Sequence, residues 1–213
     1  MTQFSDEELM MHLKQEDIPA FEELFNRYEH RICSFLYRLG GNAQESEDGT
    51  QETFLRLWKG RVLYEPSGKF STYVFQIAKN HFLHQQEKKQ YHTQYEQAAN
   101  NTSSCATKQT SSETVHDCVL DNEIQSKINK AVAMLPEKHR LVYVLSEQEH
   151  MPYKQVAEVL DCPIGTVSSR KVEAIKKLRE LLSPLRNELL SDTACMVQVT
   201  TETSDDKDNE VVQ

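Results

Sequence analysis

The 213-residue chain lacks the features that mark several large classes of protein. No stretch approaches the ~20 apolar residues of a membrane-spanning helix, and the first residues have neither the basic nor the apolar region of a secretory signal peptide. There is no glycine-rich phosphate loop, no HExxH motif and no evident pairing of a nucleophile with a base. We therefore expect a cytoplasmic protein that is not an enzyme and holds no cofactor.

The five cysteines lie far apart, and no two of them form a CxxC pair. An odd number at such spacing fits free thiols in a reducing compartment better than a disulfide framework. Cys105, His116 and Cys118 could supply three ligands to zinc, but no fourth ligand is evident and structural zinc sites need four. We therefore expect ordinary linker residues there and no metal site.

Acidic residues outnumber basic ones by 33 to 24, and the resulting net charge of −9 is unevenly spread. Residues 91–121 and 191–213 carry net charges of −3 and −5, whereas residues 122–190 carry +2. Two windows are basic: Lys69–Gln90, with four lysines against one glutamate, and Arg170–Arg179, with five cations against one glutamate. One basic window usually indicates a solvated helix face, but two in acidic surroundings favour contact with nucleic acid.

Apolar residues recur at helical spacing through the first 90 residues, and no segment alternates as a strand would. Polar residues that commonly cap helices mark the starts: Ser5 with Glu8, Asp17, and Asn42 with Glu45. The pattern predicts helices over about 5–14, 17–39, 42–59 and 71–89, with a turn at 64–70. Together these predict a first helical domain over residues 1–90.

The composition changes after this domain. Residues 91–121 are rich in Ser, Thr, Asn and Gln without apolar periodicity, which predicts a flexible linker. Periodicity resumes near residue 122 and predicts a second helical domain over 122–184, followed by an acidic, disordered tail over 185–213. Self-inhibition or partner docking is a second interpretation of the tail. The predicted fold class is all-α, with two small helical domains joined by a flexible linker.

Residues 153–178 have the pattern of a helix-turn-helix. In "YKQVAEVL" the apolar residues Val156, Ala157 and Leu160 have core spacing, and Ala157 is small enough to let a second helix cross closely. The turn is predicted at "DCPI", because Asp161 tolerates a left-handed backbone. An ordinary helical hairpin with a solvated basic face is the alternative.

The second helix of this motif would turn Val167, Ala174, Ile175 and Leu178 inward. The remaining face would meet DNA, with its N-terminal residues over base edges and its cations on phosphates. The predicted DNA-contacting residues are Gly165, Thr166, Ser168, Ser169, Arg170, Val172, Glu173, Lys176 and Lys177. So few cations predict weak binding of DNA by this domain alone, since phosphate neutralisation supplies most non-specific affinity.

Three stretches, in this order, carry a resemblance to a known family: "SEDGTQETFLRLW" (46–58), "KFSTYVFQIAKNHFLHQQEKK" (69–89), and "LPEKHRLVYVL" followed by "YKQVAEVLDCPIGTVSSRKVEAIKKL". With them, the chain resembles the sigma-70 family, specifically the two-domain extracytoplasmic-function group. The resemblance implies a sigma factor that directs core RNA polymerase to specific promoters and initiates transcription. Its implied partners are core polymerase, promoter DNA and an anti-sigma factor. A free-standing helix-turn-helix regulator that never binds polymerase is the alternative.

The resemblance also implies roles for particular residues. Those implied to bind core polymerase are Glu47, Asp48, Gln51, Glu52 and Trp58, with Phe54 mostly in the core. Those implied to contact the minus-10 element are Lys79, Asn80, Leu83, His84, Lys88 and Lys89, next to a 60–68 loop that resembles the family's base pocket. The nine residues of the helix-turn-helix would read the minus-35 element.

Five positions depart from the family pattern. Gly49 lies within the implied core-binding helix, where it would weaken the helix by ~1 kcal/mol relative to alanine. His84 and Glu87 stand where an acidic and a basic residue are frequent, which leaves the minus-10 preference open. Lys171 replaces a usual apolar residue, and Glu173 replaces a frequent base-reading arginine, although glutamate can accept from cytosine N4.

Overall fold

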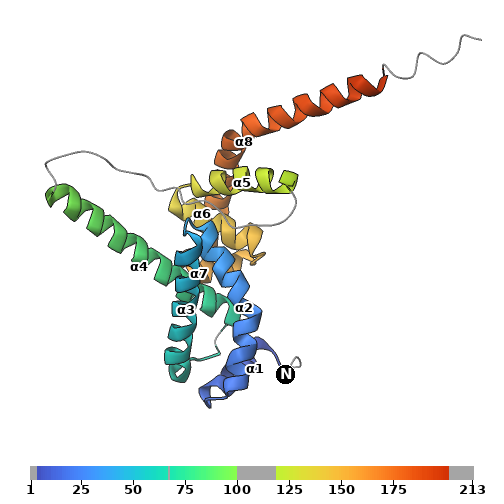
Figure 1. Ribbon diagram of the computed structural model, residues 1–213. Coiled ribbons are helices and arrows are strands. Elements are labelled where there is room, and N and C mark those ends of the chain that lie inside the picture. The colour runs from blue at the N-terminus through green and yellow to red at the C-terminus, as the bar shows by residue number, and fades with distance from the viewer. Residues whose placement is uncertain (1–3, 67, 100–118, 202–213) are drawn as a thin grey trace, which may run out of the picture.

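The computed structural model describes the backbone of residues 4–66, 68–99 and 119–201 (Figure 1), and these residues form helices and loops without a strand. In chain order the elements are α1 (Asp6–Lys14), α2 (Ile18–Arg38), α3 (Ala43–Gly60), η1 (Arg61–Leu63), α4 (Phe70–Ala99), α5 (Val119–Ala133), α6 (Glu137–Tyr143), η2 (Val144–Gln148), α7 (Tyr153–Leu160) and α8 (Ile164–Thr201). The prediction of an all-α protein is confirmed.

The starts of the first three helices follow from local hydrogen bonding. Ser5 and Glu8 form the predicted capping box of α1, in which the Glu8 amide donates to Ser5 Oγ and the Ser5 amide donates to Glu8 Oε2. Asp17 caps α2 and Asn42 caps α3 through their side-chain oxygens. Each cap accepts a hydrogen bond from a backbone N–H that the helix leaves without a partner.

Two helices end later in the chain than the sequence predicts, so these two predicted ends were wrong. Helix α4 continues to Ala99 instead of ending near Lys89, so the first residues of the predicted linker 91–121 are helical. Helix α8 continues to Thr201, past Pro184, although 185–213 were expected to be a disordered tail. These segments are polar, but residues such as Gln, Glu, Ala and Leu are good helix formers even without an apolar stripe.

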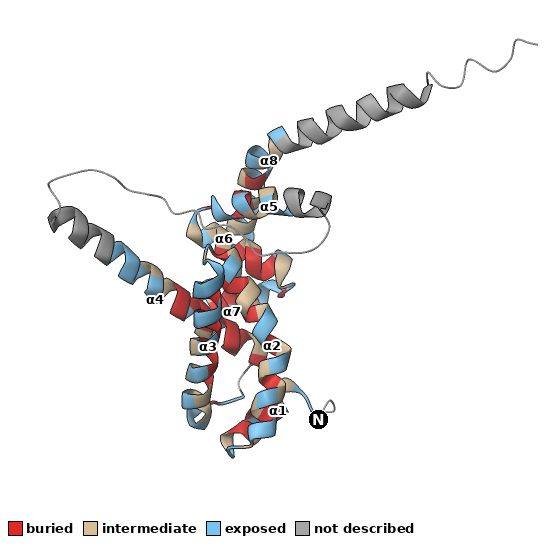
Figure 2. Ribbon diagram, in the orientation of Figure 1, coloured by how far each residue is buried: buried red, intermediate tan, exposed pale blue. Residues whose placement is uncertain are grey.

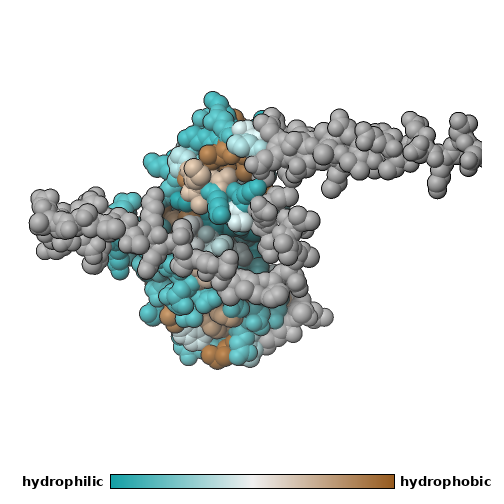
Figure 3. All heavy atoms as spheres, turned by 45° about the horizontal axis from the view of Figure 1, so that its top comes forward, coloured by the Kyte–Doolittle hydropathy of each residue, from teal (hydrophilic) through white to brown (hydrophobic). Residues whose placement is uncertain are grey.

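The apolar side chains of both halves meet in one cluster of buried residues. Helices α1 to α4 contribute Leu13, Leu24, Ile32, Phe35 and Phe75, all of which have no exposed surface. The red segments in Figure 2 show that burial extends from these helices into α6 and α7, and the η2 residues Val144 and Leu145 are also buried. On the face shown in Figure 3 the described surface is mainly hydrophilic, with small separate hydrophobic patches. The apolar surface of each half is thus partly covered by the other half.

Candidate nucleic-acid and partner interfaces

Helix α3 presents the residues implied to bind core polymerase on its outer side. Glu47, Asp48 and Gln51 are exposed, and Glu52 is half-buried. The Gln44 amide donates to Asp48 Oδ1 at 2.9 Å, and Arg56 Nε donates to Glu52 Oε1 at 2.8 Å. Both contacts stay within α3, so the carboxylates remain on the helix surface and able to accept hydrogen bonds from a partner.

Trp58 lies at the edge of this surface and is only half-buried. Its ring packs edge-on against Phe21 at 5.4 Å, and the Arg61 guanidinium lies over it at 4.3 Å. Phe54, by contrast, is 2% exposed and belongs to the core. Of the two aromatic residues on this helix, Phe54 therefore belongs to the core and Trp58 supports the outer face.

Two features of α3 escaped the sequence analysis. Leu55 is 51% exposed beside Gln51 and adds an apolar side chain to the outer surface. Gly49 is buried, and a Cβ there would lie 2.8 Å from Leu36 Cδ1 and 3.3 Å from His81 Cδ2. The glycine thus lets α2 and α4 approach α3 closely. Long-range packing of this kind leaves no signal in a single sequence.

Helix α4 carries the residues implied to contact the minus-10 element, and most of them are accessible. Asn80, His84, Lys88 and Lys89 are exposed, and Leu83 is half-buried. Lys89 is not free, because its Nζ donates to Glu45 Oε1 of α3 at 2.6 Å. These positions keep the implied DNA contacts on one accessible stretch of α4.

Lys79 is the exception, and its expected place on the exposed side of α4 was wrong. Its side chain is buried with 8% exposed surface, and Nζ donates to the Val159 carbonyl of α7 at 2.9 Å. Burial lowers the pKa of the Lys79 ammonium, while nearby Asp161 opposes this shift. The cause is tertiary: α7 packs directly on this part of α4.

A cavity of about 260 Å³ lies where the 64–69 loop meets the start of α4. Its lining residues are Tyr64, Glu65, Gly68, Lys69, Thr72, Tyr73, Gln76 and Glu158. The Tyr64 and Tyr73 rings pack at 5.1 Å, and Thr72 Oγ1 is buried without a hydrogen-bond partner. The sequence predicts a loop here but gave no such role to Thr72, Tyr73 and Gln76, although Gln76 lies one turn and Thr72 two turns before Asn80.

Helices α7 and α8 form the predicted helix-turn-helix. Asp161 ends α7 in the left-handed conformation (φ 49°, ψ 54°), as the sequence predicted for the turn. The inward side chains Val167, Ala174 and Leu178 are buried, and Ile175 is half-buried. These contacts fix the second helix across the first.

The opposite face of α8 is open. Gly165, Ser168, Ser169, Val172, Glu173 and Lys176 are exposed, while Thr166, Arg170 and Lys177 are half-buried. Val172 is 65% exposed, so its methyl groups are free to contact a partner. All nine predicted residues thus keep accessible surface in the N-terminal half of α8.

Lys171, which departs from the family pattern, has a structural explanation. Its Nζ forms an ion pair with Glu147 and lies 4.9 Å from the centre of the Tyr153 ring. The hydrogen bonds to Glu147 and Tyr153 raise the pKa of Lys171. The lysine joins η2, α7 and α8, and so takes the place that an apolar residue would fill by packing.

His81 gives the first half a pH-dependent stability. It is 8% exposed, its Nδ1 has no hydrogen-bond partner, and burial, followed by the charge of Arg56, lowers its pKa. A depressed pKa means that the folded state resists protonation, so stability is present above the ordinary histidine pKa and is lost as the pH falls through the lowered value. Urea unfolding should therefore show a lower free energy of unfolding at about pH 5.5 than at about pH 7.5.

The His81→Gln variant isolates this contribution, since the exposed His84 offers a matched control. We expect His81→Gln to reduce the loss of stability on acidification, and His84→Gln to leave it as in the wild type. Equal acid sensitivity in the wild type and His81→Gln would show that protonation of His81 does not weaken the fold.

The described side chains contain no group of three or more His, Cys, Asp or Glu residues that could hold a metal ion. Cys105, His116 and Cys118 lie outside the described residues. Among the described helices, none is long and apolar enough to cross a bilayer.

The second half of the chain is a helix-turn-helix whose recognition helix is open and basic. The first half has a cavity and an exposed acidic face. Together these features define a DNA-binding transcription protein. The family comparison is specific: the model for sigma-70 region 2 matches residues 24–91, and that for sigma-70 region 4 matches residues 125–178. Together these matches cover more than half of the chain. The chain belongs to the sigma-70 family, in its extracytoplasmic-function group.

Relatives match along almost their whole length. The RNA polymerase sigma-H factor of Pseudomonas aeruginosa is 29% identical over 193 residues, which cover 88% of this chain and 99% of the relative. The extracytoplasmic-function sigma factor SigW of Bacillus subtilis is 29% identical over 176 residues, covering 81% and 94%. Both are sigma factors, which favours the sigma interpretation over a free-standing regulator.

Solved structures support the fold. The sigma factor RpoE of Bartonella quintana, in complex with the anti-sigma factor NepR, matches with a TM-score of 0.61 and 23% identity over 76% of this chain and 96% of that chain. CnrH, in complex with the cytosolic domain of CnrY, matches with a TM-score of 0.64 and 18% identity over 85% and 99%.

Proposed function

We propose that this sigma factor divides its work between two parts of the chain. Residues 1–90 bind core RNA polymerase and open the minus-10 element, and residues 122–184 read the minus-35 element. The observation that carries the proposal is the open face of α8, which presents nine accessible residues, most of them polar or basic, outside a helix-turn-helix core. Neither part forms an enzyme active site, and the protein acts in the cytoplasm, where core polymerase is found.

Core polymerase binds to the outer face of α3 in this proposal. Asp48, Gln51 and Glu52 supply hydrogen-bond acceptors and an amide, and Trp58 with Leu55 supplies apolar area at the edge. Interfaces of this type concentrate their binding energy in a few aromatic and hydrogen-bonding residues surrounded by near-neutral contacts.

The cavity at the start of α4 receives a base from the melted strand. It offers two aromatic rings, from Tyr64 and Tyr73, and polar groups from Thr72 and Gln76. Extruding a base costs a few kcal/mol, which stacking and hydrogen bonds in a pocket can offset. Asn80, His84 and Lys88 then follow the strand along α4, with Lys88 and Lys89 on its phosphates.

The α8 helix enters the major groove of the minus-35 element. Gly165 and Thr166 place backbone amides at its N-terminus near a phosphate, and Arg170, Lys176 and Lys177 neutralise neighbouring phosphates. Ser168, Ser169, Val172 and Glu173 face the bases, where Glu173 would accept a hydrogen bond from cytosine. The acidic charge elsewhere keeps the free protein off DNA, so affinity depends on polymerase.

An anti-sigma factor is the remaining proposed partner. The RpoE and CnrH structures with similar folds were solved with NepR and with the cytosolic domain of CnrY. A protein of this type would hold the sigma factor inactive by covering surfaces that polymerase needs.

Transcription with purified components tests the proposal. Sigma-free core polymerase, this protein and fragmented genomic DNA should yield transcripts from a limited set of start sites with a shared sequence upstream. Transcripts should be absent when either protein is omitted. A folded protein that neither binds core nor alters its transcripts would overturn the proposal.

A further inference from the structure

The first helix of the chain, α1, contacts the segment that shapes the cavity proposed to receive a base. Helix α1 precedes the residues 24–91 that match the model for sigma-70 region 2. Hydrogen bonds from α1 and from the turn after it reach both ends of residues 61–70, which we call the cavity loop. This loop joins α3 to α4, so its position decides the shape of the cavity.

Lys14 of α1 fixes the middle of the cavity loop. Its ammonium donates to the Tyr64 carbonyl at 2.8 Å, across 50 residues of the chain. The Tyr64 ring is 5% exposed, packs on Tyr73 at 5.1 Å and lines the cavity. A hydrogen bond from a charged donor stabilises more than one between neutral groups. Lys14 therefore fixes the backbone of a residue whose ring forms a wall of the cavity.

Glu16, in the turn after α1, holds the start of the loop. The Arg61 guanidinium donates to the Glu16 carboxylate and to the Trp58 carbonyl, and only 15% of the Arg61 side chain is exposed. Glu16 has a φ of 64°, in the left-handed region that favours glycine or asparagine. Backbone strain of this kind persists only where surrounding contacts compensate for it. The ion pair with Arg61 is such a contact.

Glu7 of α1 holds the end of the loop, where α4 begins. Its carboxylate accepts from the Phe70 amide at 3.1 Å and lies 3.9 Å from the Lys69 ammonium. Phe70 is the first residue of α4, so its amide is one of the N–H groups that a helix leaves without a partner. A negative charge at this end also interacts favourably with the helix dipole. Glu7 thus caps α4 from another helix and fixes the turn that carries Thr72.

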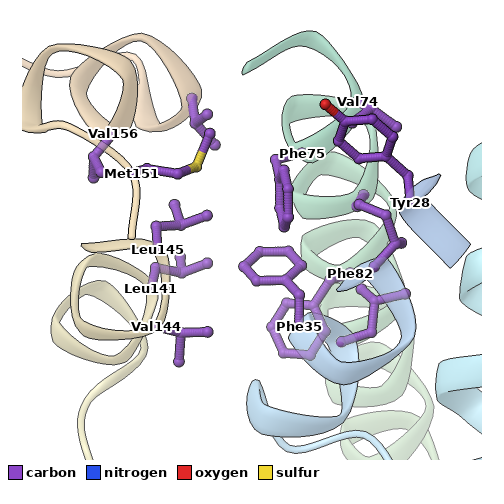
Figure 4. Packing of buried hydrophobic residues seen from close by; sticks show 14 of the residues in the cluster. Tyr28, Phe35, Val74, Phe75, Phe82, Leu141, Val144, Leu145, Met151 and Val156 are labelled. Carbon is purple, nitrogen blue, oxygen red and sulfur yellow. The ribbon is translucent and has the colours of Figure 1, made fainter. Parts of the chain in front are cut away.

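Helix α1 is itself anchored to α2, and through α2 to α4. The Tyr28 hydroxyl donates to Asp6 Oδ2, and Arg27 Nη1 donates to Asp6 Oδ1 at 2.7 Å. The Tyr28 ring packs edge-on against Phe70 at 5.1 Å. Figure 4 shows Tyr28 with Val74 on the side of the buried cluster that α2 and α4 form. Because its anchor is part of the core, α1 can hold the cavity loop in one position.

We propose that α1 is a brace for the cavity loop, and that Lys14 and Glu7 are positioning residues for promoter opening. The brace holds the Tyr64 ring and the first turn of α4 ready for an extruded base, so that binding the base does not have to order the loop. The proposal rests on the role proposed above for the cavity. Lys14 and Glu7 act through the loop and contact no DNA.

Hydrogen exchange of the free, full-length protein tests the brace without polymerase or DNA. Lys14→Met removes the ammonium and keeps an apolar stem, and Glu7→Ala removes the cap of α4. We expect either change to speed amide exchange in residues 61–70 about tenfold, since the loss of a charge-assisted hydrogen bond makes local opening easier. Glu22→Ala removes a carboxylate from an exposed site on α2 and should leave loop exchange unchanged.

Amides of α2 are the internal reference for this experiment. An equal increase of exchange in α2 would mean that Lys14 and Glu7 support the whole first half, and the proposal would be wrong. Unchanged exchange of the loop in both variants would also overturn it. Lys14→Arg retains a charged donor, so its loop should exchange at nearly the rate of the wild type.

Promoter opening by polymerase carrying this sigma factor tests whether the brace serves the cavity. We expect Lys14→Met to reduce the open fraction about tenfold, with unchanged affinity for core polymerase, and Lys14→Arg to recover most of the loss. Abasic sites placed in turn along the non-template strand separate positioning from a weakened fold. The deficit of Lys14→Met should disappear at the position of the extruded base and persist elsewhere.

Two outcomes of the opening experiment would overturn the brace. One is normal opening by Lys14→Met in spite of faster loop exchange, and the other is a deficit that persists at every abasic position. If the wild-type protein neither binds core polymerase nor opens a promoter, the proposed function fails. The exchange rates of residues 61–70 still decide in that case whether α1 holds the loop.

Discussion

Replacement of Asp48 and Gln51 by alanine should weaken the binding of core RNA polymerase by about a hundredfold, because hot-spot truncations of roughly 1.4 kcal/mol each multiply to that ratio. Both side chains are exposed on the outer face of α3. Their loss should therefore change the surface without disturbing the core. Fluorescence anisotropy of the labelled sigma factor, titrated with sigma-free core polymerase, measures the dissociation constant.

The matched control is Asn26→Ala with Glu29→Ala on α2, which also removes one carboxylate and one amide from an exposed helix face. We expect that variant to bind core polymerase like the wild type. Both double variants should unfold at nearly the same temperature as the wild type, since exposed substitutions usually change stability by less than ~0.5 kcal/mol. Unchanged binding by Asp48→Ala/Gln51→Ala would show that polymerase uses another face.

Local hydrogen bonding made much of the fold predictable. The caps at Ser5, Asp17 and Asn42 depend on side chains within four residues of the backbone groups they serve, and the left-handed turn depends on the local backbone preference of Asp161. The inward positions of α8 follow from helical periodicity alone. Such features are encoded by neighbours in the sequence, so the sequence analysis placed them correctly.

Contacts between distant parts of the chain were not predictable in this way. Lys79 was expected on the polar side of α4 together with Asn80 and His84, but α7 covers it from 80 residues away. Gly49 looked like a weak point in α3, whereas it provides the close approach of α2 and α4. Lys171 departs from the family pattern, but it forms an ion pair with Glu147 and lies over the Tyr153 ring, and neither residue is close to it in the sequence.

Substitutions in the cavity at the start of α4 should strongly reduce promoter opening. Thr72→Val with Gln76→Ala should reduce the formation of open promoter complexes by about ten- to a hundredfold, since one hydrogen bond from each side chain to an extruded base contributes about 0.5–1.5 kcal/mol. Permanganate reactivity of thymines near the start site, at a promoter recovered from the genomic transcription assay, measures the open fraction. Core binding should be unchanged, because both residues lie on α4 and not on the outer face of α3.

Thr72→Val alone should have opposite effects on stability and on function. Thr72 Oγ1 is buried without a partner, and a buried unsatisfied hydroxyl costs about 1–3 kcal/mol. Valine has nearly the same shape without the hydroxyl, so the free energy of unfolding should rise while promoter opening falls. A residue that only supported the fold would change both quantities in the same direction.

An abasic site in the DNA identifies the step at which the cavity acts. If the cavity holds an extruded base, an abasic site at that position removes the contact in the wild type. The same abasic site should not reduce promoter opening by the variant any further, because the variant already lacks the contact. The difference between wild type and Thr72→Val/Gln76→Ala should then disappear at one position of the non-template strand and persist at the others, as expected for two coupled partners. A difference that persists at every abasic position would mean that Thr72 and Gln76 do not contact a base, and the cavity would lose its proposed role.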